Sequence, residues 1–177
     1  GYNEASTVLI AQLMGIRPSK PASGGAATPA ETYAIPNRRM IAEVVGLPAI
    51  WETPLRTGNL REPNGPQVAF AAESFMDELA AAAKADPIEF RMRLLTASTA
   101  DDAEFKRARS IAVVKAAAAA YGWEGRPSPK ALARGTIVTG RGFGYCLRNN
   151  TVIADIAEVE VNRETGHVWV KRLVCAH

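Results

Sequence analysis

The order of apolar and polar side chains predicts a helix that begins near Gln67. Apolar residues recur there at spacings of three, four and seven, which is the pattern of one helix face. Glu73, Asp77 and Lys84 fall outside this apolar face, and Pro66 suits the first turn, where its missing N–H is not needed. The predicted apolar face consists of Val68, Ala71, Ala72, Phe75 and Leu79.

Two more helices follow, and their ends are marked by capping residues. Asp86 is placed as an N-cap, with Pro87 at the first helical position and Glu89 three residues after the cap, and we expect this helix to run to about Leu95. The next helix is expected from about Asp102 to Tyr121, with acidic residues near the positive end of its dipole and Gly122 closing it. Together with the helix that begins near Gln67, these two helices make a helical segment at about 67–121.

Beyond this segment the apolar period changes to two, which is typical of strands. Thr136 to Leu147 forms a β-run, and Ala157 to Val161 alternates apolar and charged residues. A turn at Asn162 to Gly166 leads into His167 to Lys171, so a C-terminal antiparallel hairpin is predicted within a β segment at about 134–176. Helices followed by antiparallel strands indicate an α+β fold rather than repeated βαβ units.

The N-terminal part has weaker patterns. Ala5 to Met14 can form a helix, whereas residues 17–31 are rich in Pro, Gly, Ala and Ser, so 1–31 is predicted to be an arm or linker. Thr32 to Val45 favours a strand, and Pro36 makes it an edge or bent one. Trp51 to Pro66 carries three prolines and two glycines and is predicted to be a long loop, a length that is often found in binding elements.

Composition and charge exclude several classes of protein. The chain has 177 residues, 47% of them apolar and 22% charged, which is typical of a globular domain with one main core. Its longest apolar stretch, Ile111 to Tyr121, is interrupted by Lys115 and is too short to cross a membrane. The net charge of +3 is dispersed along the chain, which argues against nucleic-acid binding. The chain starts without Met, and we expect it to begin within a longer protein.

The cysteines, the histidines and the glycine-rich run do not match the patterns of metal-binding, disulfide or nucleotide-binding sites. Cys146 and Cys175 lie outside any metal-binding spacing, so both are predicted to be buried small residues rather than a disulfide, and they indicate no compartment. His167 and His177 have no neighbouring ligands and are expected to face solvent. The glycine-rich run at 140–144 lies within a predicted strand, which favours close strand packing or a bulge over a nucleotide-binding loop.

The remaining candidate is the loop at residues 60–67, which delivers Arg61 and Gln67 at the start of a helix. A guanidinium group, unpaired helix N–H groups and the positive end of a helix dipole together suit an anion, such as a phosphate or an oxo-metal centre. A loop with only a structural role remains an alternative.

Three segments together resemble the molybdenum hydroxylase family, which includes xanthine dehydrogenase and aldehyde oxidase. The first is Asn-Leu-Arg-Glu-Pro-Asn-Gly-Pro-Gln at 59–67, the second is Ala-Glu-Ser-Phe-Met-Asp-Glu-Leu-Ala at 72–80, and the third is Asp-Pro-Ile-Glu-Phe-Arg at 86–91. Tyr33-Ala34-Ile35-Pro36-Asn37 is similar to a Tyr-x-x-Pro-Asn strand of the family. Residues 157–176 resemble a hairpin of bacterial isoquinoline 1-oxidoreductase and nicotinate dehydrogenase large subunits.

The resemblance implies that residues 32–177 are a fragment of a subunit. This subunit holds molybdopterin with molybdenum, in the cytosine dinucleotide form or a close relative of it. Such a subunit hydroxylates an aromatic N-heterocycle or an aldehyde with oxygen taken from water. It implies partners as well: the remainder of the large subunit and an iron–sulfur subunit that carries the iron–sulfur clusters. By position, Asn59, Leu60 and Arg61 would face the oxygen ligands of the metal, and Gly65 and Gln67 would line the cofactor pocket.

The chain departs from the family pattern in three ways. Pro63 replaces an aromatic residue of the purine-oxidising members, and Gly24 falls where those members place an Arg, so a purine substrate is disfavoured. The family's catalytic Glu, which lies in a Gly-x-Gly-Glu motif, is expected beyond His177, and neither Glu62 nor Glu73 occupies its position. We therefore name no catalytic residue and expect no activity from this chain alone. A non-catalytic interaction or assembly module of the same fold is the alternative.

Overall fold

The structure is a computed structural model, and it describes residues 13–14, 33–37, 39, 65–99, 106–131, 134–148 and 151–177. The chain divides into two compact units. The first comprises Gly1–Thr28 and Asn37–Val68, and few of its residues are described. The second comprises Pro29–Pro36 and Ala69–His177, and it contains nearly all of the described helices and strands.

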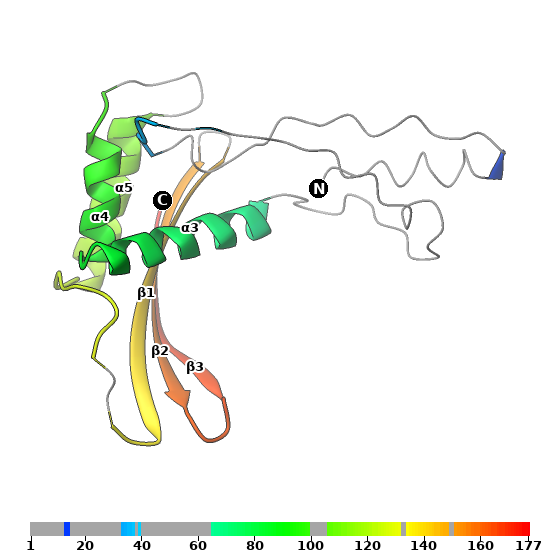
Figure 1. Cartoon of the computed structure of the whole chain (residues 1–177), viewed down its shortest axis with the longest axis vertical. Helices are drawn as coiled ribbons and strands as arrows, with labels where there is room; N and C mark the ends of the chain where they lie inside the picture. The colour runs from blue at the N-terminus through cyan, green and yellow to red at the C-terminus, as the bar shows by residue number, and fades with distance from the viewer. Residues whose placement is uncertain are drawn as a thin grey trace. The chain divides into compact units, whose positions relative to one another are not determined.

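Among the described residues, helices precede one antiparallel sheet, which confirms the predicted α+β class. The helices are α3 (Gly65–Ala82), α4 (Pro87–Thr96) and α5 (Arg107–Tyr121), and the strands are β1 (Ile137–Arg148), β2 (Thr151–Asn162) and β3 (Val168–Ala176). The strands are ordered β1-β2-β3, and α4 and α5 lie together on one side of them (Figure 1). Among the described residues, no helix has the length and apolar content needed to cross a membrane.

The start of α4 follows the predicted capping chemistry. Asp86 Oδ1 accepts hydrogen bonds from the backbone N–H groups of Ile88 and Glu89, at 2.9 and 3.0 Å, and Pro87 occupies the first turn. The predicted end of α5 is also confirmed. Gly122 adopts a left-handed conformation with φ of 77°, and its N–H donates to the last carbonyls of the helix.

The predicted start of α5 was wrong. The helix begins at Arg107, about five residues later than expected, because Lys106 is still in an extended conformation with φ of −107° and ψ of 100°. The acidic residues that were expected to open this helix, at 101–104, lie outside the described residues.

The predicted apolar face of α3 was wrong in part: Leu79 packs against the core as expected, but Phe75 does not. The buried residues of this helix are Glu73, Met76 and Ala80, whereas Phe75 is 57% exposed. The helix is rotated relative to the prediction because the Glu73 carboxylate is directed inward, toward the buried guanidinium group of Arg91. A charged residue therefore belongs to the buried face, and an aromatic residue does not.

The C-terminal hairpin was predicted correctly. Asn162 and Gly166 form the turn between β2 and β3: Gly166 has φ of 72°, and its N–H donates to the Asn162 carbonyl at 2.8 Å. A register shift between Glu158 and Val159 interrupts the pairing of β2 with β3. The core joins one face of the sheet to the helices, through Phe143, Tyr145, Val152, Ala154 and Ile156 of the strands and Met76, Leu95, Val114 and Ala117 of the helices.

Three further expectations can be compared with the described residues. Residues 33–37 are not in a strand, although the Ala34 N–H donates to the Leu94 carbonyl at 3.2 Å. Cys146 and Cys175 are exposed free thiols rather than buried residues, because each lies on a strand face that the helices do not cover. Both histidines are exposed, as predicted. The helix expected at Ala5 to Met14 and most of the strand at 32–45 lie outside the described residues.

The glycine-rich run at 140–144 is part of β1, and not a loop. The expected close packing at these glycines is absent, because a Cβ atom at Gly142 or Gly144 would meet nothing within 4 Å. At Gly140 the nearest atom to such a Cβ would be Val159 Cγ2, at an ordinary contact distance of 3.9 Å. These glycines therefore leave one side of β1 bare.

Candidate functional site

Two of the five predicted site residues are described, and both lie in the first turn of α3. Gly65 is half-buried and Gln67 is exposed, and this turn contains no acidic residue. The first N–H groups of a helix lack partners within it, and the helix dipole places partial positive charge there. This turn is thus chemically suited to an anionic group. Asn59, Leu60 and Arg61 lie outside the described residues.

Among the described residues of the second unit, a polar cluster is centred on Arg91, whose side chain is fully buried. Its Nε donates to Glu73 Oε2 at 2.9 Å, and its Nη1 donates to Asp77 Oδ1 at 2.7 Å. The remaining bonds go to backbone carbonyls, from Nη1 to Pro87 at 3.1 Å and from Nη2 to Glu73 at 2.8 Å. The guanidinium group also lies 5.4 Å from the ring centre of Phe143. Arg91 therefore ties α4 to α3 through a buried ion pair.

Glu73 extends this cluster from the helices to the sheet. Its Oε1 accepts a hydrogen bond from the Tyr33 hydroxyl at 2.9 Å, and its Oε2 accepts one from the Tyr145 backbone N–H of β1 at 3.1 Å. The rings of Tyr33 and Tyr145 also lie 6.0 Å apart, so the carboxylate is held by two neighbouring residues from different segments of the chain.

Burial governs the protonation of this cluster. Desolvation, reinforced by the negative charge of Glu73, raises the pKa of the Tyr33 hydroxyl. Desolvation also raises the pKa of Glu73 and raises that of Tyr145 to about 12, whereas the Glu73 carboxylate helps to raise the pKa of Arg91. Both tyrosines therefore remain protonated hydroxyls at neutral pH. Because Glu73 and Arg91 already make their hydrogen bonds within the protein, these two side chains are suited to holding segments together rather than to reacting with a ligand.

The cluster brings together three of the segments on which the family resemblance was based. Tyr33 comes from 33–37, Glu73 and Asp77 come from 72–80, and Arg91 ends the segment 86–91. Sequence reasoning missed this cluster because it placed Glu73 off the buried face of α3. A signal was present: Glu73 lies three residues before Met76 and seven before Ala80, which is the spacing of one helix face.

A second polar cluster is centred on Asp86, the N-cap of α4. Its Oδ2 accepts hydrogen bonds from Trp123 Nε1 and from the backbone N–H of Arg126, both at 3.0 Å, so the carboxylate has four donors among the described residues. Arg141 of β1 stacks on the Trp123 ring at 3.7 Å from its centre. The cluster thus fastens the segment after α5 to the start of α4 and to β1. Among the described residues, no group of three histidine, cysteine or acidic side chains could hold a metal ion.

No family model matches the chain, but three oxidoreductases contain a stretch that is similar to it. A subunit of the nicotinate dehydrogenase of Pseudomonas putida is 35% identical over 135 residues, which are 71% of this chain and 10% of that protein. The beta subunit of the isoquinoline 1-oxidoreductase of Brevundimonas diminuta is 34% identical over 110 residues, or 62% of this chain and 12% of that protein.

The third relative is the membrane-bound aldehyde dehydrogenase [pyrroloquinoline-quinone] of Gluconacetobacter polyoxogenes, 32% identical over 128 residues, or 69% of this chain and 16% of that protein. The chain thus spans between a tenth and about a sixth of the length of these relatives. The similarities support a relationship of this chain to oxidoreductase subunits of a molybdenum hydroxylase-related family.

Proposed function

We propose that the chain is part of the molybdenum-cofactor-binding subunit of an oxidoreductase that hydroxylates an aromatic N-heterocycle or an aldehyde with oxygen taken from water. The observation that carries this proposal is the similarity over 135 residues to the nicotinate dehydrogenase of Pseudomonas putida. The names of the relatives support the substrate classes, because nicotinate and isoquinoline are N-heterocycles and the third name specifies an aldehyde.

The proposed cofactor site is the loop at 59–67 together with the first turn of α3. Asn59, Leu60 and Arg61 would face the oxygen ligands of molybdenum, while Gly65 and Gln67 would line the pocket of the pterin dinucleotide. The described part of this site fits an anionic group, because the first turn of α3 carries no acidic residue and its helix N–H groups are donors. When bound, the cofactor supplies the two-electron oxidation chemistry.

In this proposal the chain supplies one wall of the cofactor pocket and not the whole reaction. The remainder of the subunit would provide the catalytic base, and an iron–sulfur partner would carry electrons away. The buried cluster around Arg91 contributes by fixing α3, on which the proposed pocket residues Gly65 and Gln67 lie, to α4. We propose Arg91 and Glu73 as structural supports and not as groups that touch the substrate.

The name of the third relative specifies pyrroloquinoline quinone, which is a different cofactor from the proposed molybdenum cofactor. The two cofactors differ chemically, since the quinone contains no metal and the pterin cofactor holds molybdenum. Metal analysis of the purified complete subunit, together with the absorption spectrum of the cofactor released on denaturation, distinguishes them.

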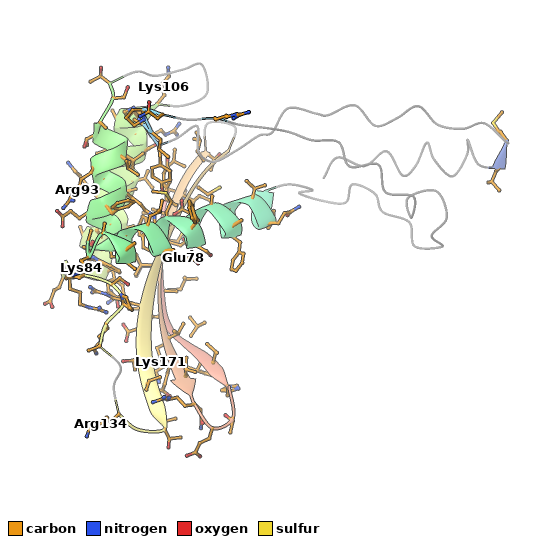
Figure 2. The ribbon with its side chains drawn as sticks, viewed as in Figure 1. Glu78, Lys84, Arg93, Lys106, Arg134 and Lys171 are labelled. Carbon is orange, nitrogen blue, oxygen red and sulfur yellow. The ribbon has the colours of Figure 1, made fainter. Side chains whose placement is uncertain are left out.

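Arg61→Ala in the complete subunit tests the site itself. The loss of this guanidinium group is expected to remove about 2–4 kcal/mol of binding or transition-state stabilisation, which corresponds to a decrease of about 30- to 1000-fold in turnover or cofactor affinity. The control is Arg93→Ala, which removes an exposed guanidinium group on the outer side of α4 and is expected to leave both unchanged (Figure 2). Unchanged molybdenum content and unchanged turnover in Arg61→Ala would exclude Arg61 from the site.

A further inference from the structure

The sheet has a second face, which the core residues do not use. We call it the open face; it consists of the even-numbered residues from 138 to 146 in β1, the odd-numbered residues from 153 to 161 in β2, and Val168, Val170, Leu173 and Cys175 in β3. None of these residues is buried, and Val170 and Leu173 are 57% and 64% exposed. The helices α4 and α5 lie on the other side of the strands (Figure 1).

The open face is apolar, although it is exposed. Asp155 is its only charged residue, and β1 contributes Gly140, Gly142 and Gly144, which leave the backbone of that strand bare. Near the hairpin the opposite face is the polar one, with Arg141, Glu158, Glu160 and Arg172 among its residues. A sheet with one face in solvent normally carries its apolar residues on the covered face. The distribution of side chains therefore indicates that the open face is covered by an apolar surface.

Asp155 does not make the open face polar. It lies in β2 between Gly144 and Cys175, and within the described part of the chain its Oδ1 is shielded from solvent. Its carboxylate interacts with the Cys175 thiol and raises the pKa of that thiol. A covering segment therefore meets mainly the apolar side chains of this face.

The size of the open face favours a covering segment from the same polypeptide. With a rise of about 3.3 Å per residue and strands about 4.8 Å apart, the face measures roughly 400 Å². A stable complex of separate proteins buries about 800 Å² on each partner, which is about twice this area. A segment of the same polypeptide avoids most of the entropy lost when two molecules associate, so it can cover a small face stably.

We propose that the open face is the docking surface for an apolar segment of the same, longer polypeptide. This inference rests on the proposed function, in which the chain is one part of a larger subunit. The lengths of the relatives agree with it, since the chain spans only 10% to 16% of them. The glycine positions of β1 let the docked segment approach the strand backbone closely.

The two thiols of the chain are natural probes of this docking, because Cys146 and Cys175 both lie on the open face and are exposed. The experiment compares the rates of maleimide labelling in the 177-residue chain and in the complete subunit. Both are measured at one fixed pH, because the neighbouring Asp155 raises the pKa of the Cys175 thiol. We expect both thiols to react readily in the 177-residue chain and at least about tenfold more slowly in the complete subunit, because reaction requires access to the thiolate. Equal rates in the two proteins would overturn the inference.

A matched pair of variants shows whether the protection is specific to this face. Val170 and Trp169 are neighbours in β3 with exposed fractions of 57% and 58%, but they lie on opposite faces of the sheet. In a background with Cys146→Ser and Cys175→Ser, we expect Val170→Cys to be protected in the complete subunit and Trp169→Cys to react equally in both proteins. Equal protection of both positions would overturn the inference, because the covering would then enclose β3 rather than dock on one face.

A second copy of the chain is the competing occupant. It would protect the thiols in the isolated 177-residue chain in a concentration-dependent way, and this result would overturn the inference. The proposed function is tested separately. A complete subunit that binds molybdenum but labels as fast as the isolated chain contradicts only the docking inference, whereas protected thiols without molybdenum contradict only the proposed cofactor.

Discussion

Replacing Arg91 by Met removes a guanidinium group from the interior of the second unit while keeping a long apolar side chain. The Arg91 side chain is 0% exposed and makes four hydrogen bonds, two of them to the carboxylates of Glu73 and Asp77. In the variant the Glu73 carboxylate stays buried, and its remaining donors are the Tyr33 hydroxyl and the Tyr145 N–H. The substitution therefore leaves an uncompensated charge in the core.

Breaking a buried ion pair by removal of one partner costs about 3–5 kcal/mol. We expect the lower part of this range, about 3 kcal/mol, because Glu73 keeps two neutral donors and Asp77 is 46% exposed and can be hydrated. This is a large share of the roughly 5–15 kcal/mol that stabilises a typical domain. Adding Glu73→Gln to Arg91→Met removes the buried charge and should recover about 1–2 kcal/mol.

The assay is urea unfolding of the 177-residue chain, followed by circular dichroism. Arg93→Met is the matched control, since Arg93 lies on the same helix and its ion pair with Glu89 is exposed, with 62% and 60% of the two side chains accessible. The control should cost less than about 0.5 kcal/mol, as exposed pairs four residues apart usually do. Equal losses of unfolding free energy in the two variants would refute the idea that burial makes the Arg91 ion pair more important for stability than the exposed Arg93 pair.

Two other predictions concern stability. Burial raises the pKa of Tyr33 and raises that of Tyr145 to about 12, whereas the pKa of an unfolded tyrosine is near 10. The two protonated hydroxyls therefore stabilise the fold fully below pH 10, and this stabilisation is lost as the pH rises through the folded-state pKa values. The free energy of unfolding should fall above about pH 10 by up to about 2.7 kcal/mol per pH unit. Urea titrations at several alkaline pH values measure this, and an unchanged unfolding midpoint would contradict it. Asp86→Asn places an amide NH₂ against the donors of Trp123 and Arg126 and should cost about 1–3 kcal/mol, whereas an unchanged urea midpoint would show that these contacts contribute little.

Local chemistry explains which parts of the fold were predictable. The N-cap at Asp86 and the C-cap at Gly122 depend on groups within a few residues, so the sequence pattern was sufficient for both. The hairpin turn at Asn162 is local in the same way, since its side chain accepts from residues two and three positions later. The two caps and the turn were confirmed at the expected residues, whereas β2 begins six residues earlier and β3 ends five residues later than the expected strands.

Distant partners explain what could not be predicted from the sequence. The spacing of Glu73, Met76 and Ala80 is that of one helix face, but it does not reveal which groups pair with the Glu73 carboxylate. Arg91 lies 18 positions later and the Tyr145 N–H lies 72 positions later, and no periodicity reports such pairs. The exposure of Cys146 and Cys175 depends on which face of the sheet the helices cover, and alternation within a strand does not determine this. For the site, the first turn of α3 lies where it was expected, whereas Asn59, Leu60 and Arg61 remain a prediction that rests on the resemblance.

The central claim is that this chain belongs to a subunit that holds a molybdenum cofactor. The most direct test is the molybdenum-to-protein ratio of the complete subunit, purified with its iron–sulfur partner from cells that make the cofactor, and measured by elemental analysis alongside the isolated 177-residue chain. We predict about one molybdenum per complete subunit and none bound stoichiometrically to the isolated chain, since an occupied metal site binds with near-unit stoichiometry. A complete, active subunit that contains no molybdenum and releases a quinone cofactor would contradict the claim.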